Sequence, residues 1–336
     1  MTITLGVQDL MPRHEDVSTE QAFHETLALA QYVDQLGYRR IWFSEHHNTN
    51  SVLSSAPELM VAHVAGITHQ IRVGVGGIMV MHYAALKVAE QMKVLSALAP
   101  GRIDFGMGRA PGGDTVATDL LAQGHPDLRD DQYHKIETIL QLITDQPISV
   151  AHHHKAIAIP TDLNHWPEPW LLGASGQSVR FAAEQGLAYS FATFFGIHYD
   201  PAIYQIYREH FQSSVFFQAP RVSACYGVIC AEDTETVNWL ARPVELQRLQ
   251  RYHYEESGYV SPNHARYLAI SPDDQSIIAD YYHRRVMIKG TPDQVADILK
   301  DEAEKYQLDE ILIYSPIADI ELRRQNYKLI MDAMKE

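Results

Sequence analysis

The sequence predicts an α/β fold, a (β/α)8 TIM barrel, from three observations. Short β-branched or apolar runs alternate with segments of helical period along the chain, which indicates repeated βα units and a parallel sheet. Eight of these runs are long enough for a strand. The chain has 336 residues and no linker rich in Pro, Gly or Ser, which favours one barrel domain over residues 1–336. A doubly wound sheet is the alternative.

The elements are expected in strict alternation. The expected strands are Ile3–Gln8, Arg40–Ser44, Ile71–Val80, Ile103–Gly106, Trp170–Gly173, Ala188–Phe191, Val222–Cys230 and Glu310–Tyr314. The expected helices are Thr19–Leu36, Pro57–Thr68, Ala84–Leu98, Asp131–Thr144, Gln177–Gln185, Tyr199–Phe211, Thr234–Tyr254 and Pro292–Tyr306, with a last one over "DIELRRQNYKLIMDAM". Two stretches break the rhythm, Ala110–Asp130 after strand four and Glu255–Lys289 after strand seven. We predict that these insertions form the rim of the active site.

Composition excludes several classes of function. The net charge of −15 disfavours a nucleic acid or an anionic membrane surface as partner, because both require a basic footprint. No signal-peptide pattern and no apolar run of transmembrane length occurs, so a cytoplasmic protein is expected. Cys225 and Cys230, five positions apart on one expected strand, point to opposite faces, which argues against a disulfide. A small molecule is the expected ligand.

The stretch "IWFSEHHN" places Glu45, His46 and His47 directly after the second expected strand. In a (β/α)8 barrel the chemistry collects at the carboxyl ends of the strands. Because side chains alternate in extended backbone, His46 and His47 cannot both face the same pocket. A metal role is disfavoured here and at His152–His154, since no ligand cluster of the usual spacing accompanies either run. A loop imidazole bonded to backbone is the competing interpretation of His46.

Three other stretches follow expected strands. Gly76 and Gly77 interrupt an apolar strand, which is typical of a bulge or of close approach by a flat ligand. Arg109 lies in "GRIDFGMGRAPGGD", where backbone amides are accessible. In "WLLGASGQSVRF" a small-residue turn leads into a helix start with the hydroxyls of Ser175 and Ser178, which suits a phosphate but also an ordinary helix cap.

Together, "EHHN", "VGVGG", "AEQ", "PGRIDFGMGRAPGGD" and "GASGQSVRFAAEQGLAYSF" resemble, in order, the bacterial luciferase-like flavin monooxygenases, over nearly the whole chain. The resemblance implies a (β/α)8 barrel that uses reduced FMN and O₂. It places Arg109 and the Ser175/Ser178 helix start, with Ala174 beside them, at the FMN phosphate. It places Gly76–Gly77, with an unusual and sometimes cis peptide, under the flavin ring. His46 falls on the family's catalytic histidine, preceded by Glu45.

One departure limits what the resemblance implies. Gly108 stands where the luciferase catalytic subunit has a reactive cysteine, so light emission is not expected. Reduced flavin supplies the redox chemistry with O₂, and it needs a dry pocket and a controlled proton. A histidine of ordinary pKa, about 6.5, can hold that proton, and Glu45 is expected to orient an imidazole or to brace the strand end. The pocket wall is expected from Met79, Met81, His82, Phe191, Phe194 and Phe195.

The sequence also suggests which partners the protein has. No dinucleotide-binding turn is present, so reduced FMN is expected from a separate flavin reductase. The helices Pro57–Thr68 and Ala84–Leu98 are apolar over more than one stripe, and the resemblance points to a homodimer through them. A non-catalytic flavin-binding protein, a deazaflavin-dependent reductase and, least favoured, a metal-dependent hydrolase remain alternatives. The substrate is a small molecule that the sequence does not identify.

Overall fold

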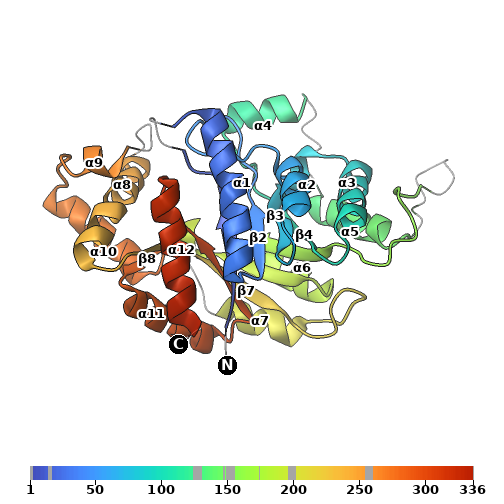
Figure 1. Cartoon of the computed structure of the whole chain (residues 1–336). Helices are drawn as coiled ribbons and strands as arrows, with labels where there is room; N and C mark the ends of the chain where they lie inside the picture. Colours follow the sequence, from blue (N-terminus) through green and yellow to red (C-terminus); the bar gives the residue numbers. More distant parts are fainter. Residues whose placement is uncertain are drawn as a thin grey trace.

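A computed structural model describes residues 3–13, 17–123, 131–146, 148, 156–173, 175–195, 202–253 and 260–335 (Figure 1). The strands are β1 (Thr4–Asp9), β2 (Arg40–Phe43), β3 (Arg72–Met79), β4 (Ile103–Gly108), β5 (Glu168–Gly173), β6 (Ala188–Ala192), β7 (Val222–Cys230), β8 (Met287–Gly290) and β9 (Glu310–Tyr314). The helices are α1 (Thr19–Leu36), α2 (Pro57–Ile67), α3 (Ala85–Leu98), α4 (Thr115–Leu121), α5 (Gln132–Ile143), α6 (Gly176–Glu184), α7 (Ala202–His210), α8 (Thr234–Tyr252), α9 (Pro262–Ala265), α10 (Pro272–His283), α11 (Pro292–Tyr306) and α12 (Ile320–Lys335). Short 3₁₀ turns are η1 (Val80–His82) and η3 (Thr193–Phe195).

The parallel sheet closes into a barrel. Strands β1 to β6 pair in sequence order, β6 pairs with β7, and β9 lies between β7 and β1. The closed ring therefore has eight parallel strands with helices around it, and the predicted (β/α)8 barrel is confirmed. The ninth strand, β8, pairs only with the end of β7, at Gly227–Cys230, and adds no member to the ring.

Local sequence explains where most helices begin and end. The Ser18 hydroxyl accepts the amide of Gln21 and starts α1, and Gly37 ends that helix at φ 89°, in the left-handed region that favours glycine. The expected bounds of α1 and α11 match the structure residue for residue, and the other predicted helices differ by at most two positions at each described end. The predicted start at Tyr199 lies outside the described residues.

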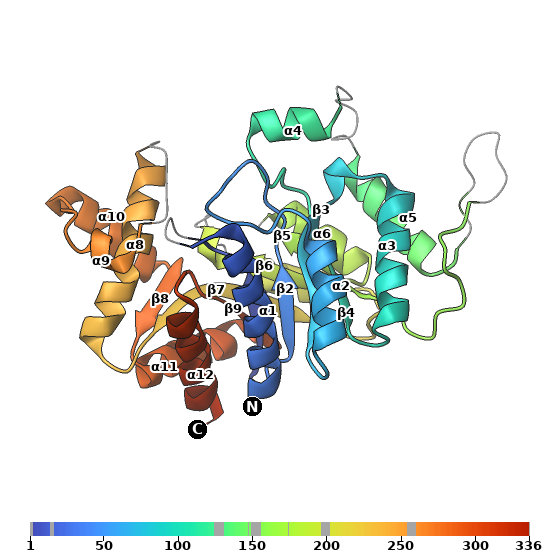
Figure 2. The same ribbon diagram turned by 45° about the horizontal axis from the view of Figure 1, so that its top comes forward.

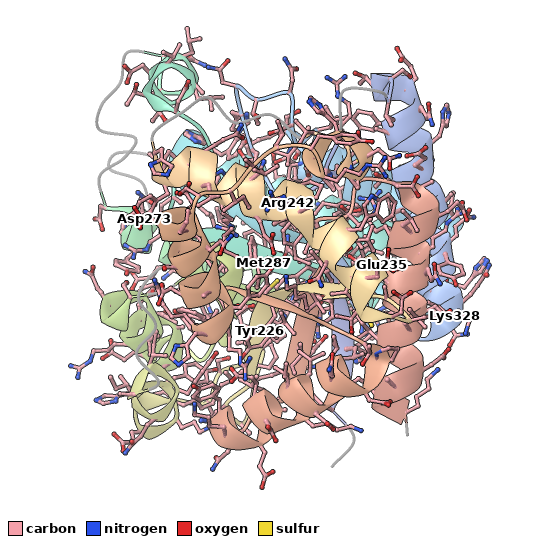
Figure 3. All side chains as sticks on the ribbon, turned by 90° about the vertical axis from the view of Figure 1, so that its left-hand side faces the viewer. Tyr226, Glu235, Arg242, Asp273, Met287 and Lys328 are labelled. Carbon is pink, nitrogen blue, oxygen red and sulfur yellow. The ribbon has the colours of Figure 1, made fainter. Side chains whose placement is uncertain are left out.

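The insertion after β7 is more regular than its sequence suggests. The stretch "SGYVSPNHARYLAISPDDQ" shows no helical period, yet α9 and α10 begin within it, and β8 follows them (Figure 3). Both helices start at a Ser-Pro pair, Ser261-Pro262 and Ser271-Pro272, with the serine as cap and the proline in the first turn. Helix α10 has no fully buried residue, so it lacks the apolar stripe that reveals a helix in a sequence. Likewise α4 forms within the insertion after β4.

The barrel has an inner and an outer core. Inside, Trp42 and Trp170 meet edge to face with ring centroids 5.2 Å apart, beside Leu312 and Cys225. The larger outer core fills the space between strands and helices and includes Cys230. The two cysteines are thus on opposite faces of β7, buried and free, as their spacing predicts.

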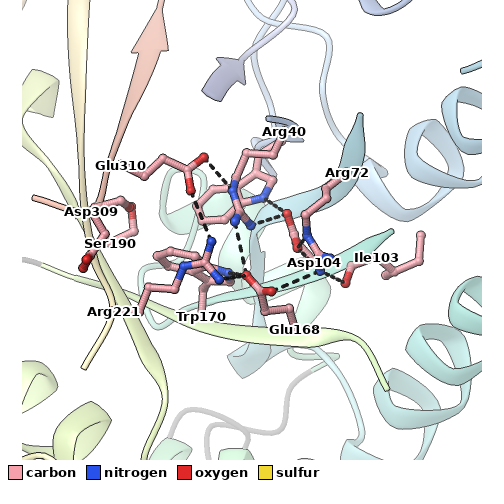
Figure 4. Close-up of polar contacts among 12 residues, drawn as sticks. Arg40, Arg72, Ile103, Asp104, Glu168, Trp170, Ser190, Arg221, Asp309 and Glu310 are labelled. Carbon is pink, nitrogen blue, oxygen red and sulfur yellow. Dashed lines mark hydrogen bonds and ion pairs between the residues drawn. The ribbon is translucent and has the colours of Figure 1, made fainter. Parts of the chain in front are cut away.

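A network of buried charges closes the amino end of the barrel (Figure 4). Arg40, at the start of β2, donates to Asp104 of β4 at 2.5 Å, to Glu310 of β9 at 2.8 Å and to Glu168 of β5 at 3.2 Å. Burial alone would raise the pKa of Asp104, but the guanidinium groups of Arg40 and Arg72 outweigh burial and lower it. The interior at this end is therefore filled.

A helix that spans a bilayer needs about 20 predominantly apolar residues. None of the described helices is both long enough and apolar enough to span a membrane.

Candidate functional site

A cavity of about 430 Å³ opens at the other end of the barrel, where the strands terminate. Its lining comes from the ends of β2 to β6 and from the loop after β4. The lining residues are Ser44, Glu45, His46, Gly76, Gly77, Met79, Gly108, Arg109, Ala110, Gly112, Leu172, Gly173, Ser178 and Ala192. Six of the eight residues singled out in the sequence, all but Ala174 and Ser175, are brought together here.

Glycines form one wall because the strands approach too closely for side chains. The Gly76–Gly77 peptide is cis. A Cβ at Gly76 would lie 2.7 Å from Trp42, and one at Gly77 would lie 2.9 Å from the carbonyl oxygen of Gly106. The Gly76 carbonyl accepts the Gln8 amide at 2.7 Å, which fixes the peptide to β1. Close packing therefore leaves no room for a Cβ at either position, and this part of the cavity wall consists of backbone without side chains.

Glu45 is fully buried and both of its carboxylate oxygens are occupied. Oε2 accepts the backbone amide of Met79 at 2.7 Å. Oε1 bonds to His47 Nε2 at 2.8 Å and accepts the Tyr83 hydroxyl at 2.7 Å. Glu45 therefore braces the end of β3 and orients an imidazole, and that imidazole belongs to His47.

The two histidines diverge as side-chain alternation predicts. His46 lines the cavity, whereas His47 turns to Glu45 and meets the His82 ring edge to face at 5.7 Å. His46 Nδ1 lies 3.0 Å from the Ser44 hydroxyl, and its backbone amide donates to the Ser54 carbonyl. Nε2 of His46 has no partner among the described residues, so it is the ring nitrogen left for a ligand.

The structure corrects the pKa expected for His46. Burial, the charge of Arg251 and then His47 lower the pKa of His46 to about 4, and Glu45 opposes them only weakly. Burial disfavours the charged imidazolium because it removes hydration. His46 is therefore neutral throughout the neutral pH range, rather than half-protonated near pH 6.5 as an ordinary histidine would be.

Arg109 also lines the cavity and stacks on Tyr133 of α5, its guanidinium carbon 4.3 Å from the ring centroid. No described carboxylate pairs with Arg109. The Tyr133 hydroxyl oxygen is buried and has no described hydrogen-bond partner. Arg109 lines the cavity and Tyr133 packs behind its guanidinium, so a cation without a described counter-ion is left at this end of the site.

The start of α6 faces the same end of the cavity. Ser175 caps the helix and accepts the Ser178 amide at 3.3 Å, while the Ser178 hydroxyl bonds to the Ser175 carbonyl at 2.8 Å. Ser178 lines the cavity, whereas Ser175 is exposed and does not. The amides of Gly176 and Gln177 donate to no described residue. Ala174 lies outside the described residues.

The expected wall is only partly realised. Met79 lines the cavity, whereas Phe191 belongs to the outer core, because β6 turns the neighbouring Ala192 inward instead. His82 bonds to the Pro111 carbonyl, and the Phe195 side chain is outside the described structure. Tyr133 was missed, because its position depends on how α5 packs against the loop after β4.

A metal site needs several His, Cys, Asp or Glu side chains that converge on one point. Across the described ranges, no group of three or more His, Cys, Asp or Glu side chains is placed to hold a metal ion. The run His152–His154 lies outside those ranges.

Comparisons place the chain among known proteins. The family model described as luciferase-like monooxygenase matches residues 3–309. The uncharacterized protein YwcH of Bacillus subtilis is 34% identical over 99% of this chain and 100% of its own length. The N-acetyl-S-alkylcysteine monooxygenase of the same organism is 29% identical over 99% and 98%.

Solved structures agree on the fold. Apo-MsnO8 superposes with a TM-score of 0.89 at 27% identity, over 99% of this chain and 98% of that one. The oxygenating constituent of 3,6-diketocamphane monooxygenase from Pseudomonas putida, in complex with FMN, gives 0.72 at 18% identity over 98% and 97%. An F420-dependent secondary alcohol dehydrogenase gives 0.70 at 12% identity over the full length of both. The last two likenesses concern the fold alone.

Proposed function

This chain belongs to the luciferase-like monooxygenase family, and on that premise we propose that it is the oxygenase of a two-component system that uses reduced FMN and O₂ on a small organic substrate. The family supports a flavin-dependent monooxygenase. The observation that carries the choice of FMN is Arg109, which lines the cavity without a described counter-ion and packs against Tyr133, a residue whose buried hydroxyl also lacks a described partner.

A phosphate fits that end of the cavity. Arg109 supplies a charged donor, Tyr133 a buried hydroxyl, and the start of α6 the free amides of Gly176 and Gln177. Helix starts favour anions because their amides and the helix dipole point outward. A terminal phosphate is an acceptor that these donors could share. Ser175 caps the helix start at this position.

An isoalloxazine ring fits the flat wall. The backbone of Gly76–Gly77 and Gly108 presents no side chain to the cavity, so a planar ring can lie against it. At about 430 Å³ the cavity has the size of typical cofactor sites. FMN when bound in reduced form supplies the electrons that activate O₂.

His46 is proposed to control a proton at the reaction centre. Its Nε2 faces the cavity without a described partner, and its low pKa keeps the ring neutral. The Ser44 hydroxyl can donate to Nδ1 or accept from it, so Nε2 can act as donor or acceptor by a tautomer change. Glu45 acts indirectly, by holding the end of β3 and the His47 ring.

The electrons are proposed to come from a separate flavin reductase. The chain has no dinucleotide-binding turn. Rapid reduction of FMN by NADH or NADPH with this protein alone would contradict a two-component system.

The decisive experiment is an FMN titration followed by a substrate screen with a supplied reductase under O₂. The proposal expects tight FMN binding, and substrate-dependent incorporation of one atom from ¹⁸O₂ into product. Flavin binding without product for any substrate points to a non-catalytic flavoprotein. Preferential binding of F420 points to a deazaflavin-dependent reductase, in keeping with the F420-dependent neighbour of this fold.

A homodimer through α2 and α3 is proposed from the surface of these helices. Leu59, Val94 and Leu98 are 68%, 46% and 69% exposed, and with Ile159 they line a groove between the helices. Clustered apolar side chains of this size mark protein contact sites. Sedimentation at micromolar concentration is expected to give a dimer, and Leu98→Glu a monomer. A monomeric parent protein would remove this proposal.

Two further proposals concern the chain as a whole. Residues 1–336 are taken as one domain, since the ring of strands draws on both ends of the chain, and a single cooperative unfolding transition is expected. A cytoplasmic location is proposed as well, and recovery of the native protein in a membrane or secreted fraction would contradict it.

A further inference from the structure

The loop that joins β2 to α2 contains one buried serine. This loop lies at the same end of the barrel as α4, and the Asn48 side chain in it donates to Asp114, the cap of α4 (Figure 2). Residues 46–53 and 55 are half-buried or exposed, whereas Ser54 is only 1% exposed. A hydroxyl that is buried in an otherwise accessible loop is expected to have a specific partner.

Ser54 is bonded to the residues on both sides of Glu45. Its hydroxyl donates to the carbonyl of Ser44, and its carbonyl accepts the amide of His46 at 2.8 Å. Ser44 is also held from the other side, because its amide donates to the carbonyl of Asp9, at the end of β1, at 3.2 Å. Ser54 therefore fixes the backbone of Ser44 and that of His46 relative to each other.

Ser44 and His46 also meet through their side chains. Ser44 Oγ lies 3.0 Å from His46 Nδ1, and both residues line the cavity. Ser44 is 5% exposed, and Nδ1 is the one acceptor that its hydroxyl contacts among the described residues. If Nδ1 carried the ring hydrogen, the hydroxyl hydrogen of Ser44 would be buried without a described acceptor, which costs free energy. The geometry therefore favours the ring hydrogen on Nε2.

We propose that Ser54 is a positioning residue that holds the Ser44 hydroxyl against Nδ1 of His46, so that the hydrogen of the neutral imidazole stays on Nε2. What this does for the reaction rests on the proposed function. In the resting site His46 then offers a hydrogen-bond donor, rather than an acceptor, to an oxygen atom in the cavity. A serine that only satisfies the loop would leave the position of the ring hydrogen unchanged when it is replaced.

The test follows the two ring nitrogens of His46 by ¹⁵N NMR in the flavin-free protein. At neutral pH the ring is uncharged, because the pKa of His46 is about 4, so the ¹⁵N shifts report where the hydrogen lies. His46→Gln identifies the signals by their loss. The parent is expected to show a protonated Nε2 and an unprotonated Nδ1. Ser44→Ala and Ser54→Ala should both move the two shifts toward each other, as in a mixture of tautomers, whereas Ser44→Thr, which keeps the hydroxyl, should not.

Ser55→Ala is the matched control, because Ser55 is an exposed serine of the same loop. A parent spectrum with the hydrogen on Nδ1 would overturn the inference, and this measurement stands even if a variant fails to fold. Shifts in Ser54→Ala that match those in Ser55→Ala would overturn the role of Ser54. With FMN and a reductase, Ser54→Ala should also release more hydrogen peroxide per reduced FMN than Ser55→Ala does. A parent that binds no FMN contradicts the proposed function, whereas the shifts of the flavin-free protein still decide this inference.

Discussion

The two ends of the barrel treat polar groups in opposite ways. At the amino end, Arg40 is fully buried and pairs with three carboxylates from three different strands. At the carboxyl end, Arg109 and His46 keep polar atoms with no described partner, and glycines replace side chains in the wall. The amino end of the barrel is thus filled by paired charges, whereas the carboxyl end is open and has polar groups without a described partner.

The contrast separates groups that hold the fold from groups that await a ligand. Gly6 illustrates the closed end, because a Cβ there would lie 2.8 Å from the Arg40 side chain. Because Gly6 has no Cβ, the Arg40 side chain has room beside β1. At the carboxyl end the barrel leaves a cavity. In (β/α)8 barrels the active site lies at this face, whereas residues at the amino face contribute to stability.

The largest effect is expected from breaking the closed end. Arg40→Met should cost about 3–5 kcal/mol of unfolding free energy, because removal of one partner leaves buried carboxylates unpaired. Urea unfolding measures this. Arg39→Met, the exposed neighbour, is the control and should be nearly neutral. Equal destabilisation by both substitutions would mean that the network contributes no more than surface charge.

The next effect is on the open end and should leave the fold intact. Arg109→Ala should weaken FMN binding by about 1.5–3 kcal/mol, the range of hydrogen bonds to charged groups, without changing the unfolding midpoint. Tyr133→Phe should weaken FMN binding by about 0.5–1.5 kcal/mol, since it removes one neutral hydrogen bond. Because it also removes a buried hydroxyl without a described partner, the apo protein should not lose stability.

Fluorescence titration of FMN provides both measurements. Arg180→Ala, an exposed arginine of α6 that contacts His210, is the matched control. Unchanged FMN affinity in Arg109→Ala would take Arg109 out of the site.

Substitution of His46 is expected to change the binding energy of FMN little but to change the yield of hydrogen peroxide. His46→Ala should bind FMN as the parent does, yet release more hydrogen peroxide per reduced FMN consumed, because the proton at the cavity is no longer controlled. Stopped-flow mixing of the reduced complex with O₂ gives the reoxidation rate, and a peroxide assay gives the yield. His47→Ala should alter stability through Glu45 and leave the yield unchanged. Identical yields in His46→Ala and the parent would leave His46 a structural loop residue.

The smallest expected effect is the pH dependence carried by His46. Its pKa is about 4 in the folded protein and ordinarily about 6.5, so the unfolded chain binds more protons between these values. Stability should therefore fall as pH falls from about 6.5 to 4, and His46→Gln should fall less steeply over that window. An NMR titration of the imidazole should show a midpoint near 4. A midpoint near the ordinary value would mean that the ring is well hydrated.

The sequence by itself determined the order of strands and helices and many of their ends. These features depend on short-range physics: helical or strand period, a serine cap before α1, and a glycine after it. The same local patterns placed Glu45, His46, Gly76, Gly77, Arg109 and Ser178 at strand ends, where barrel geometry brings them together. Alternation along one strand end was enough to predict that His46 and His47 face different ways.

Only the tertiary structure decided what surrounds those residues. Arg40 and Glu310 are 270 positions apart in the chain, and no local pattern reveals that they pair. The low pKa of His46 arises from burial and from Arg251, which a distant helix brings near. Tyr133, β8 and α10 were missed for the same reason, since packing partners rather than local period define them. Desolvation and charge pairing depend on three-dimensional neighbours, so they appear only once the barrel is closed.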